Sequence, residues 1–424
     1  MRLATALVML LLAAVAFAQD AAKSASQPKS VMVPMTIDHN RIVINVTLPF
    51  PDGSLERIRA WVDNGNPDLY MSRRAAGLMG LKVVCDDKAC SAPPPPEVMI
   101  GDMKISLATV KEVKIPLKPI AAAAVMAPGM SAEINIPSSV LRNYDVLIDF
   151  PGRQFTIAQP GSLAFKGVSG KVAVNPESGL IQVPSQVENK KYSLALDLGA
   201  SVSFLSEELF DKLATAHPDW PHMTGAVGPA NMWGLPDEPN WKLMRLDRLQ
   251  YGPLHLTGVP FVKFNAEALA IPGKRGALPT AGLLGSQALL NYRVGLDYAH
   301  ATVFFDIGRL SNFPDFDIVG LILRPEDDGR FTILGVADYE GKPSLPQGLN
   351  GVQAGDHLVA VDGNPVANFT LGLVWSLLLG GQEHKLTLER GGKEFTVAAN
   401  VHHFLDDESG GDGSTGKTKK NEKH

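Results

Sequence analysis

The stretch AWVDNGNPDLYMS occupies residues 60–72, and a similar stretch, LALDLGASVSFLS, occupies residues 194–206. In each, an apolar run leads into an Asp-x-Gly turn, at Asp63 or at Asp197, and a second apolar run follows. A carboxylate at the end of a buried strand loses its hydration, so it needs hydrogen bonds, a partner or a proton. The glycine lets backbone N–H groups approach that carboxylate. The sequence therefore predicts two similar carboxylate turns.

Each turn is followed by a second matching segment, which indicates an internal duplication. INIPSSVLRNYDVLIDFPGRQFTIA covers residues 134–158, and AGLLGSQALLNYRVGLDYAHATVFF covers residues 281–305, with a shared Asn-Tyr pair. The two repeats are residues 31–160 and residues 168–308. In both, short alternating runs of Val, Ile and Leu are broken by Gly, Pro and Asp, which predicts antiparallel strands joined by turns. The expected fold class is mainly β, with short helices at residues 72–79 and 206–216 that each begin at a serine able to cap them.

The chain of 424 residues is 45% apolar and 20% charged, with a formal net charge of −5, as in a globular protein of two or three domains. This small, dispersed charge excludes the basic surface that nucleic acid binding requires.

The two cysteines, Cys85 and Cys90, predict a local disulfide in an exported protein. A metal site would need further ligands, and no suitably spaced ones stand nearby.

The two ends of the chain differ in kind from the repeats. Residues 1–18 carry an apolar run that closes on Ala-Phe-Ala, which is typical of a cleaved secretory signal peptide. An uncleaved anchor is the alternative, but the run is shorter than the ~20 residues of a spanning helix. Residues 19–30 are expected to form a linker, and residues 404–424 a disordered tail without apolar periodicity.

The doubled arrangement resembles the retropepsin-like and pepsin-like aspartic peptidases. Each lobe of that family carries an apolar strand, Asp-[Thr/Ser]-Gly-[Ala/Ser/Thr], and a later apolar-apolar-Gly segment. The second repeat matches with Asp197-Leu198-Gly199-Ala200 and Leu283-Leu284-Gly285. The first repeat departs further, with Asp63-Asn64-Gly65-Asn66 and Asn135-Ile136-Pro137. The resemblance implies a bilobal double β-barrel.

It also implies a shared site in which Asp63 and Asp197 are catalytic. Like charges a few ångströms apart cannot both ionise cheaply, so the pair retains one proton and activates a water without metal or cofactor. The supporting loop residues are Asn64, Gly65, Gly199 and Ala200. Asn64 offers a donor and an acceptor where the family keeps a hydroxyl, whereas Leu198 offers neither.

The family also closes a β-hairpin flap over its substrate, and neither repeat has a clear one. The stretch ANMWGLPDEPNW, residues 230–241, exposes Trp233 in a Gly/Pro-rich setting and is the candidate in the second repeat. The stretch CDDKACSAPPPPEVMIG, residues 85–101, lies at the corresponding place in the first repeat.

A C-terminal unit, residues 316–403, does not share the repeat. Its stretch GVQAGDHLVAVDGNPV, residues 351–366, resembles bacterial PDZ domains. Such domains take a peptide as an added strand and hold its carboxylate on the backbone N–H groups of an apolar loop. The loop that fits consists of Ile318, Val319, Gly320 and Leu321, with a helix around residues 371–379 as pocket wall. The alternative is that these are core residues of a small β domain.

Together these patterns predict an exported, periplasmic aspartic endopeptidase whose PDZ-like unit recruits a protein or peptide. The alternative is an inactive peptide-binding or scaffold protein of the same fold. Leu198 and Pro137 favour the alternative, whereas the retention of both Asp-x-Gly turns favours the enzyme. No nucleic acid partner is expected, and no membrane span after signal cleavage.

Overall fold

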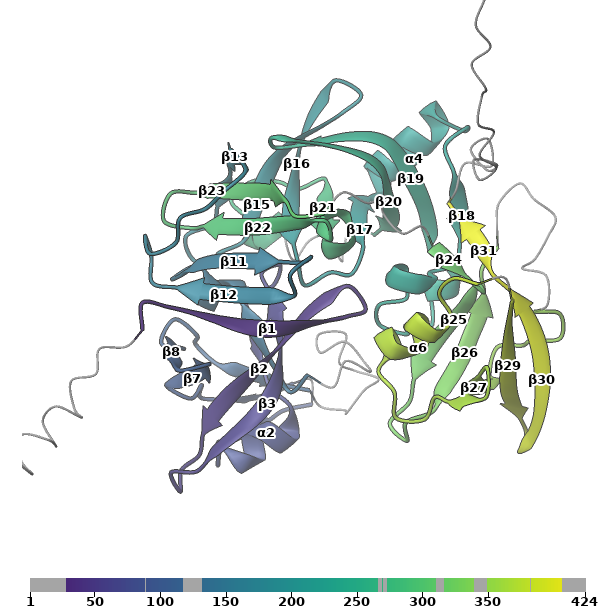
Figure 1. The fold of residues 1–424 in the computed structure, drawn as a ribbon, viewed down its shortest axis with the longest axis horizontal. Coiled ribbons are helices and arrows are strands. Elements are labelled where there is room, and N and C mark those ends of the chain that lie inside the picture. The colour runs from purple at the N-terminus through teal and green to yellow at the C-terminus, as the bar shows by residue number, and fades with distance from the viewer. Residues whose placement is uncertain are drawn as a thin grey trace, which may run out of the picture.

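The computed structural model describes residues 28–87, 89–116, 132–265, 269, 273–309, 316–338, 349–381 and 383–405. The expected signal peptide, nearly all of the linker and the tail beyond residue 405 lie outside these residues. Strands dominate the described chain and form several sheets and a barrel, which confirms the expected mainly β class (Figure 1).

The largest sheet contains strands of both repeats. Its order is β10 (Ile134–Pro137), β3 (Leu55–Asp63), β2 (Arg41–Pro49), β1 (Ser30–Asp38), β12 (Gln154–Ala158), β11 (Asp145–Asp149), β22 (Tyr292–Asp297), β23 (Thr302–Ile307) and β13 (Val168–Lys171). The hairpin of β7 (Glu97–Ile100) and β8 (Met103–Ser106) joins it through β2. The alternation of buried and exposed residues along β1 and β8 is the pattern that the sequence predicts.

A local twofold relation joins the two repeats within this sheet. Strand β11 pairs antiparallel with β22, with Asp145 opposite Asp297 and Asp149 opposite Arg293. Equivalent positions in the repeats differ by 148 residues, since 297 − 149 = 148 and 293 − 145 = 148. Each strand therefore contributes equivalent positions to the pair, and in the same arrangement the two Asp-x-Gly turns lie against each other.

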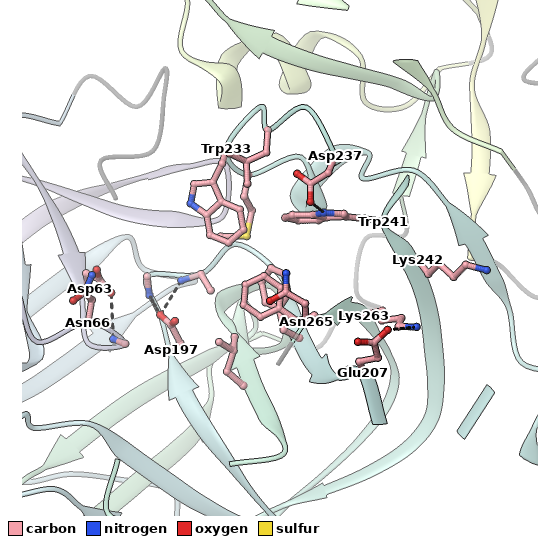
Figure 2. A pocket seen from close by; sticks show the side chains of 18 of the residues that line it. Asp63, Asn66, Asp197, Glu207, Trp233, Asp237, Trp241, Lys242, Lys263 and Asn265 are labelled. Atoms are coloured by element: carbon pink, nitrogen blue, oxygen red, sulfur yellow. Dashed lines mark hydrogen bonds and ion pairs between the residues drawn. The ribbon is translucent and has the colours of Figure 1, made fainter. Parts of the chain in front are cut away.

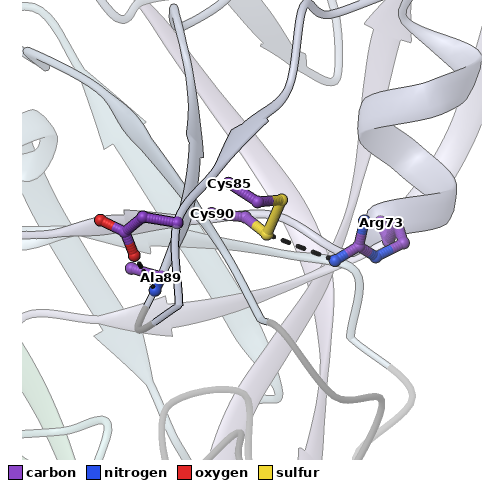
Figure 3. Close-up of a disulfide and its surroundings, with 5 residues drawn as sticks. Arg73, Cys85, Ala89 and Cys90 are labelled. Atoms are coloured by element: carbon purple, nitrogen blue, oxygen red, sulfur yellow. Dashed lines mark hydrogen bonds between the residues drawn. A yellow bond between two sulfur atoms is a disulfide. The ribbon is translucent and has the colours of Figure 1, made fainter.

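Two smaller sheets complete the repeats. One has the order β14 (Ala173–Val174), β15 (Ile181–Val187), β16 (Lys190–Asp197), β21 (Gly282–Gly285), β17 (Ser203–Ser206), β20 (Leu254–Phe264), β19 (Lys242–Tyr251) and β18 (His222–Thr224). The other has the order β4 (Leu69–Tyr70), β9 (Val113–Ile115), β6 (Cys90–Ala92) and β5 (Val84–Cys85). A disulfide between Cys85 and Cys90 links β5 to β6, and Arg73 donates to Cys90 Sγ (Figure 3).

The helices in the described residues are short. They are α2 (Arg73–Leu78), α3 (Ser138–Leu141), α4 (Glu207–Ala216) and α6 (Leu371–Leu377), with 3-10 turns η1 (Gly228–Ala230), η2 (Glu238–Asn240) and η3 (Ser286–Leu289). Helices α2, α4 and α6 each begin at a residue whose side chain caps the helix. The side chains of Ser72 and Ser206 accept from backbone N–H groups of α2 and α4, as the sequence predicts. No helix in the described ranges is long and apolar enough to cross a membrane.

The C-terminal unit packs on the second repeat. Its main sheet has the order β25 (Leu321–Pro325), β26 (Phe331–Val336), β27 (His357–Val361), β29 (Glu383–Arg390) and β30 (Lys393–Asn400), with β28 (Asn364–Pro365) on β27 and a separate pair of β24 (Phe316–Ile318) and β31 (His402–Phe404). One apolar core cluster contains residues of this sheet, of α6 and of the second repeat. Figure 1 shows the yellow-green unit beside β18 of the second repeat.

Candidate active site

Two parallel strand pairs position the carboxylates. Strand β3 ends at Asp63, and β10 runs parallel to it with Pro137 opposite Asp63. Strand β16 ends at Asp197, and β21 runs parallel to it with Gly285 opposite Asp197. Pro137 therefore takes the place of the expected glycine in the first repeat. It is accommodated because β10 is the last strand in its sheet order, and edge strands tolerate proline.

Backbone N–H groups bind the carboxylate in each turn. Gly65 N–H donates to Asp63 Oδ1 at 3.2 Å. Gly199 N–H and Ala200 N–H each donate to Asp197 Oδ1 at 3.0 Å. Asp63 Oδ2 is buried and has no hydrogen-bond partner within the described part of the chain. One oxygen of the first carboxylate is thus left for a shared proton or a water.

Each glycine faces the aspartate of the opposite turn. A Cβ atom on Gly65 would lie 2.0 Å from Asp197 Cγ, and one on Gly199 would lie 2.3 Å from Asp63 Oδ1. No side chain fits at either position, so the two turns interlock around the carboxylates. Figure 2 shows Asp63 and Asp197 side by side at one end of a cavity. Residues that are 134 apart in sequence, since 197 − 63 = 134, therefore form one site.

A single amide braces the two turns. Asn64 Nδ2 donates to Leu196 O at 2.8 Å, and Leu198 N–H donates to Asn64 Oδ1 at 2.7 Å. The Leu198 side chain is fully buried and contributes packing only, while Ser286 Oγ donates to Leu198 O at 2.7 Å. The Asn64 amide thus uses both its donor and its acceptor to bind the opposite turn. The Leu198 side chain makes no such bond, so the two turns are joined from the first repeat only.

Burial gives both carboxyls raised pKa values. The pKa of Asp63 lies well above its ordinary value because the group is desolvated and because the charge of Asp197 opposes ionisation. Desolvation raises the pKa of Asp197 to about 6. The nearby Arg41 guanidinium lowers the pKa of both groups, but less than burial raises them. The pair therefore holds a proton at a pH where isolated carboxyls have lost theirs.

The Arg41 side chain is itself buried beside the pair, at 1% exposure. Its Nη2 donates to Met232 O at 3.2 Å, and its guanidinium lies 5.8 Å from the ring centre of Trp61. Arg41 thus connects the carboxylate pair to the segment that carries Met232. The sequence gives no signal for Arg41, because an arginine in a β-hairpin carries no pattern that separates a buried cation from an exposed one.

A cavity of about 660 Å³ extends from the two carboxylates, within the size range of ligand sites. Its aromatic wall consists of Phe204, Trp233, Trp241 and Phe264, whose ring centres lie 4.4 to 6.2 Å apart. Its charged rim contains Glu207, Asp237, Lys242 and Lys263 (Figure 2). An apolar chamber with a polar rim beside two acids suits an extended peptide with a bulky apolar side chain.

The remaining predicted residues fall in different places. Asn64, Gly65, Gly199 and Ala200 all lie at the carboxylate pair. Of the two flap candidates, residues 230–241 line the cavity, whereas the described lining includes nothing from residues 85–101. Only the three-dimensional contact identifies Phe204 and Phe264 as lining residues, since nothing in the sequence separates them from core phenylalanines.

The predicted peptide-binding loop of the C-terminal unit is closed to solvent in this structure. The side chains of Ile318, Val319 and Leu321 are fully buried. Gly320 has φ of +81°, and its carbonyl accepts from Ala337 N–H at 2.8 Å. The side chains of the loop thus belong to the apolar core, as in the alternative that the sequence leaves open. Within the described residues no group of three or more His, Cys, Asp or Glu is arranged to hold a metal ion.

Comparison with known proteins gives a distant likeness in structure and none in sequence. No family model matches the chain, and no curated protein matches it. Among solved structures the chain is similar to an aspartic proteinase from Irpex lacteus, with a TM-score of 0.40 and 12% identity over 67% of this chain and 98% of that chain.

The raised pKa of Asp197 predicts a pH-dependent stability. In the unfolded chain this carboxyl loses its proton near 3.8, and in the folded chain near 6, so the folded state loses stability as the pH rises from about 4 to about 6. The rise in the pKa of Asp197 corresponds to a loss of about 3 kcal/mol in the free energy of unfolding, at ~1.4 kcal/mol per pKa unit. Urea unfolding of Asp197→Asn and of the wild type at pH 4 and pH 7 measures this loss.

The expected result is a smaller loss of stability between the two pH values in Asp197→Asn. Asp52→Asn, at an exposed carboxyl in the turn between β2 and β3, serves as the control and should follow the wild type. Equal losses in Asp197→Asn and the wild type would show that Asp197 titrates normally in the folded protein.

Proposed function

We propose that the chain is an aspartic-type endopeptidase that hydrolyses peptide bonds with Asp63 and Asp197. The observation that supports this most is the pair of buried carboxyls, of raised pKa, at the end of a cavity large enough for a peptide. Metal and cofactor are not part of the proposed reaction.

In the proposed reaction the ionised carboxyl of the pair accepts a proton from a water, whose oxygen attacks the carbonyl carbon of the peptide bond. The protonated carboxyl donates to the carbonyl oxygen, so the tetrahedral intermediate forms without a full negative charge. The C–N bond then breaks as the carboxyl that took the water proton gives it to the leaving nitrogen, and a hydroxyl of the intermediate returns its proton to the other carboxyl, so the pair again carries one proton. Asn64 keeps the two turns at a fixed spacing throughout, and the glycines leave room for the carboxyls.

The remaining assignments extend this proposal. Residues 31–160 and 168–308 are proposed as the two peptidase-like lobes, and residues 316–403 as a PDZ-like domain that acts with them. Residues 1–18 are proposed as a secretory signal peptide, which places the mature protein in the periplasm. The proposed substrate is an unfolded protein or a peptide with a bulky apolar residue, because aromatic side chains form the wall of the cavity.

A second candidate is a protein of the same fold that binds peptides without cutting them. The observation that favours it is Leu198, which leaves the brace between the turns to a single amide. A small loss of alignment at a catalytic pair costs orders of magnitude in rate, whereas it changes peptide binding little.

Incubation of the purified chain from residue 19 onward with a denatured protein, from pH 3 to pH 8, tests the proposal. Hydrolysis requires one proton on the pair, and burial raises the pKa of Asp197 to about 6. We therefore expect hydrolysis to increase as the pH rises through about 6 and to persist at neutral pH. Fragments are measured by mass spectrometry.

Two outcomes would contradict this expectation. A maximum near pH 3 would mean that the carboxyls ionise at ordinary pKa values. An absence of fragments at every pH, together with a change in tryptophan fluorescence on adding peptide, would support the binding protein instead, because Trp233 and Trp241 line the cavity.

A further inference from the structure

The free edge of the C-terminal sheet is already occupied by a side chain of the second repeat. Strand β25 is the end strand of its sheet order, and such an edge offers unpaired backbone groups to an added strand. Here Leu323 N–H donates to Asn231 Oδ1 at 2.9 Å, and Asn231 Nδ2 donates to Leu323 O at 2.9 Å. One amide thus makes the two bonds that a residue of an added strand would make.

The orientation of this amide is determined by a second buried contact. Asn231 Nδ2 also donates to Glu238, whose Oε1 accepts from Trp233 N–H at 2.9 Å. Asn231 and Glu238 are both fully buried. An amide rotated by 180° would set its N–H₂ against Leu323 N–H, so only one orientation satisfies all partners.

The chain around Asn231 packs its apolar side chains into the C-terminal unit. Val227, Ala230 and Met232 share one core cluster with a set of C-terminal side chains that includes Ile318, Leu323 and Val374. Backbone bonds of 2.8 Å also join Thr224 to Asp338 in both directions. In Figure 1 this segment, between β18 and β19, lies against β24 and β25.

The same segment forms one wall of the cavity. Met232 and Trp233, the two residues after Asn231, both line it. Met232 O also accepts from the buried Arg41, whose charge acts on both carboxyls. A continuous set of contacts therefore runs from β25 through Asn231 to the carboxylate pair.

We propose that Asn231 is a positioning residue of the cavity, and that the C-terminal unit fixes the wall of residues 227–241 by binding Asn231 on the edge of β25. The edge of β25 thus has an internal ligand, and a free peptide that adds to β25 must displace Asn231. The effect on hydrolysis rests on the proposed function, whereas the effect on the wall does not.

Asn231→Leu tests this, because leucine has a similar size but cannot bond to Leu323. It leaves two buried backbone groups of β25 unpaired, so local opening becomes more frequent. Hydrogen–deuterium exchange followed by mass spectrometry should show residues 227–241 exchanging about 10- to 100-fold faster than in the wild type. In hydrolysis we expect KM to rise more than kcat falls, since Trp233 lines the cavity while the carboxylate turns keep their own bonds.

Asn364→Leu is the matched control, because Asn364 is exposed in β28 and lies away from β25. It should leave both exchange and KM unchanged. If Asn231→Leu does not fold, Asn231→Ala replaces it, since alanine also removes both bonds to Leu323 without placing a larger side chain beside Glu238, and faster exchange is again expected.

The outcomes separate the two proposals. Exchange at the wild-type rate in residues 227–241 of a folded Asn231 variant would overturn the role of Asn231. Faster exchange in that variant, with no hydrolysis by the wild type, would support the role of Asn231 in the wall and contradict the peptidase proposal.

Discussion

Replacing Asp63 or Asp197 by asparagine is expected to lower hydrolysis by ~10²- to 10⁴-fold, the scale of a lost general acid–base group. Asparagine has nearly the same shape as aspartate, and its Oδ1 still accepts from the N–H groups of the turn. It can neither take a proton from water nor share one with its partner. Fragment production at pH 6 to 7 is the measurement.

The control for this pair of variants is Asp52→Asn, which removes an exposed carboxyl and should keep the wild-type rate. Thermal unfolding shows whether each variant is folded. Retention of more than a tenth of the wild-type rate in either Asp63→Asn or Asp197→Asn would exclude a shared-proton mechanism. Loss of activity in both variants, with tryptophan fluorescence still responding to peptide, would show that hydrolysis needs both carboxyls and that peptide binding in the cavity does not.

Gly65→Ala is expected to have the second largest effect. The new Cβ would lie 2.0 Å from Asp197 Cγ, far inside contact distance, so Asp197 or the whole turn must move. Overpacking of this kind costs about 1–3 kcal/mol, and a displacement of about 1 Å at the pair costs ~100-fold in rate. We expect at least that loss in hydrolysis together with a lower unfolding temperature.

Gly77→Ala is the matched control for this substitution. Gly77 is exposed in α2, and nothing lies within 4 Å of the position of its Cβ. Alanine favours a helix over glycine by about 0.5–1 kcal/mol, so Gly77→Ala should be neutral or slightly stabilising. Wild-type rate and stability in Gly65→Ala would mean that the two turns do not interlock.

Much of the fold can be predicted from the sequence, because strands and helix starts depend on local sequence patterns. Alternating apolar residues predict the strands, and Ser72 and Ser206 predict where two helices begin. The doubled Asp-x-Gly pattern also predicts a common site, because two copies of one fold meet around a twofold axis. The aligned repeats also put Pro137 at the position of the family's glycine, and the strand register agrees, since Pro137 lies opposite Asp63 as Gly285 lies opposite Asp197.

The sequence does not indicate whether the predicted peptide-binding loop is buried or exposed. Residues 318–321 form an apolar stretch whether they bind a peptide or belong to the core, and their burial depends on what packs against them. The same holds for Asn231, which stands in a Gly/Pro-rich stretch like many surface asparagines. Its partner Leu323 is 92 residues away, and no periodic pattern links the two.

The sequence by itself determined the strand-rich repeats and the two carboxylate turns, because these follow from local turn chemistry and hydrophobic periodicity. Only the tertiary structure decided that Arg41 is buried beside the carboxylates and that Asn231 binds β25. Both depend on contacts between distant segments, and a residue gains its electrostatic and hydrogen-bonding role from the neighbours that the packed chain supplies.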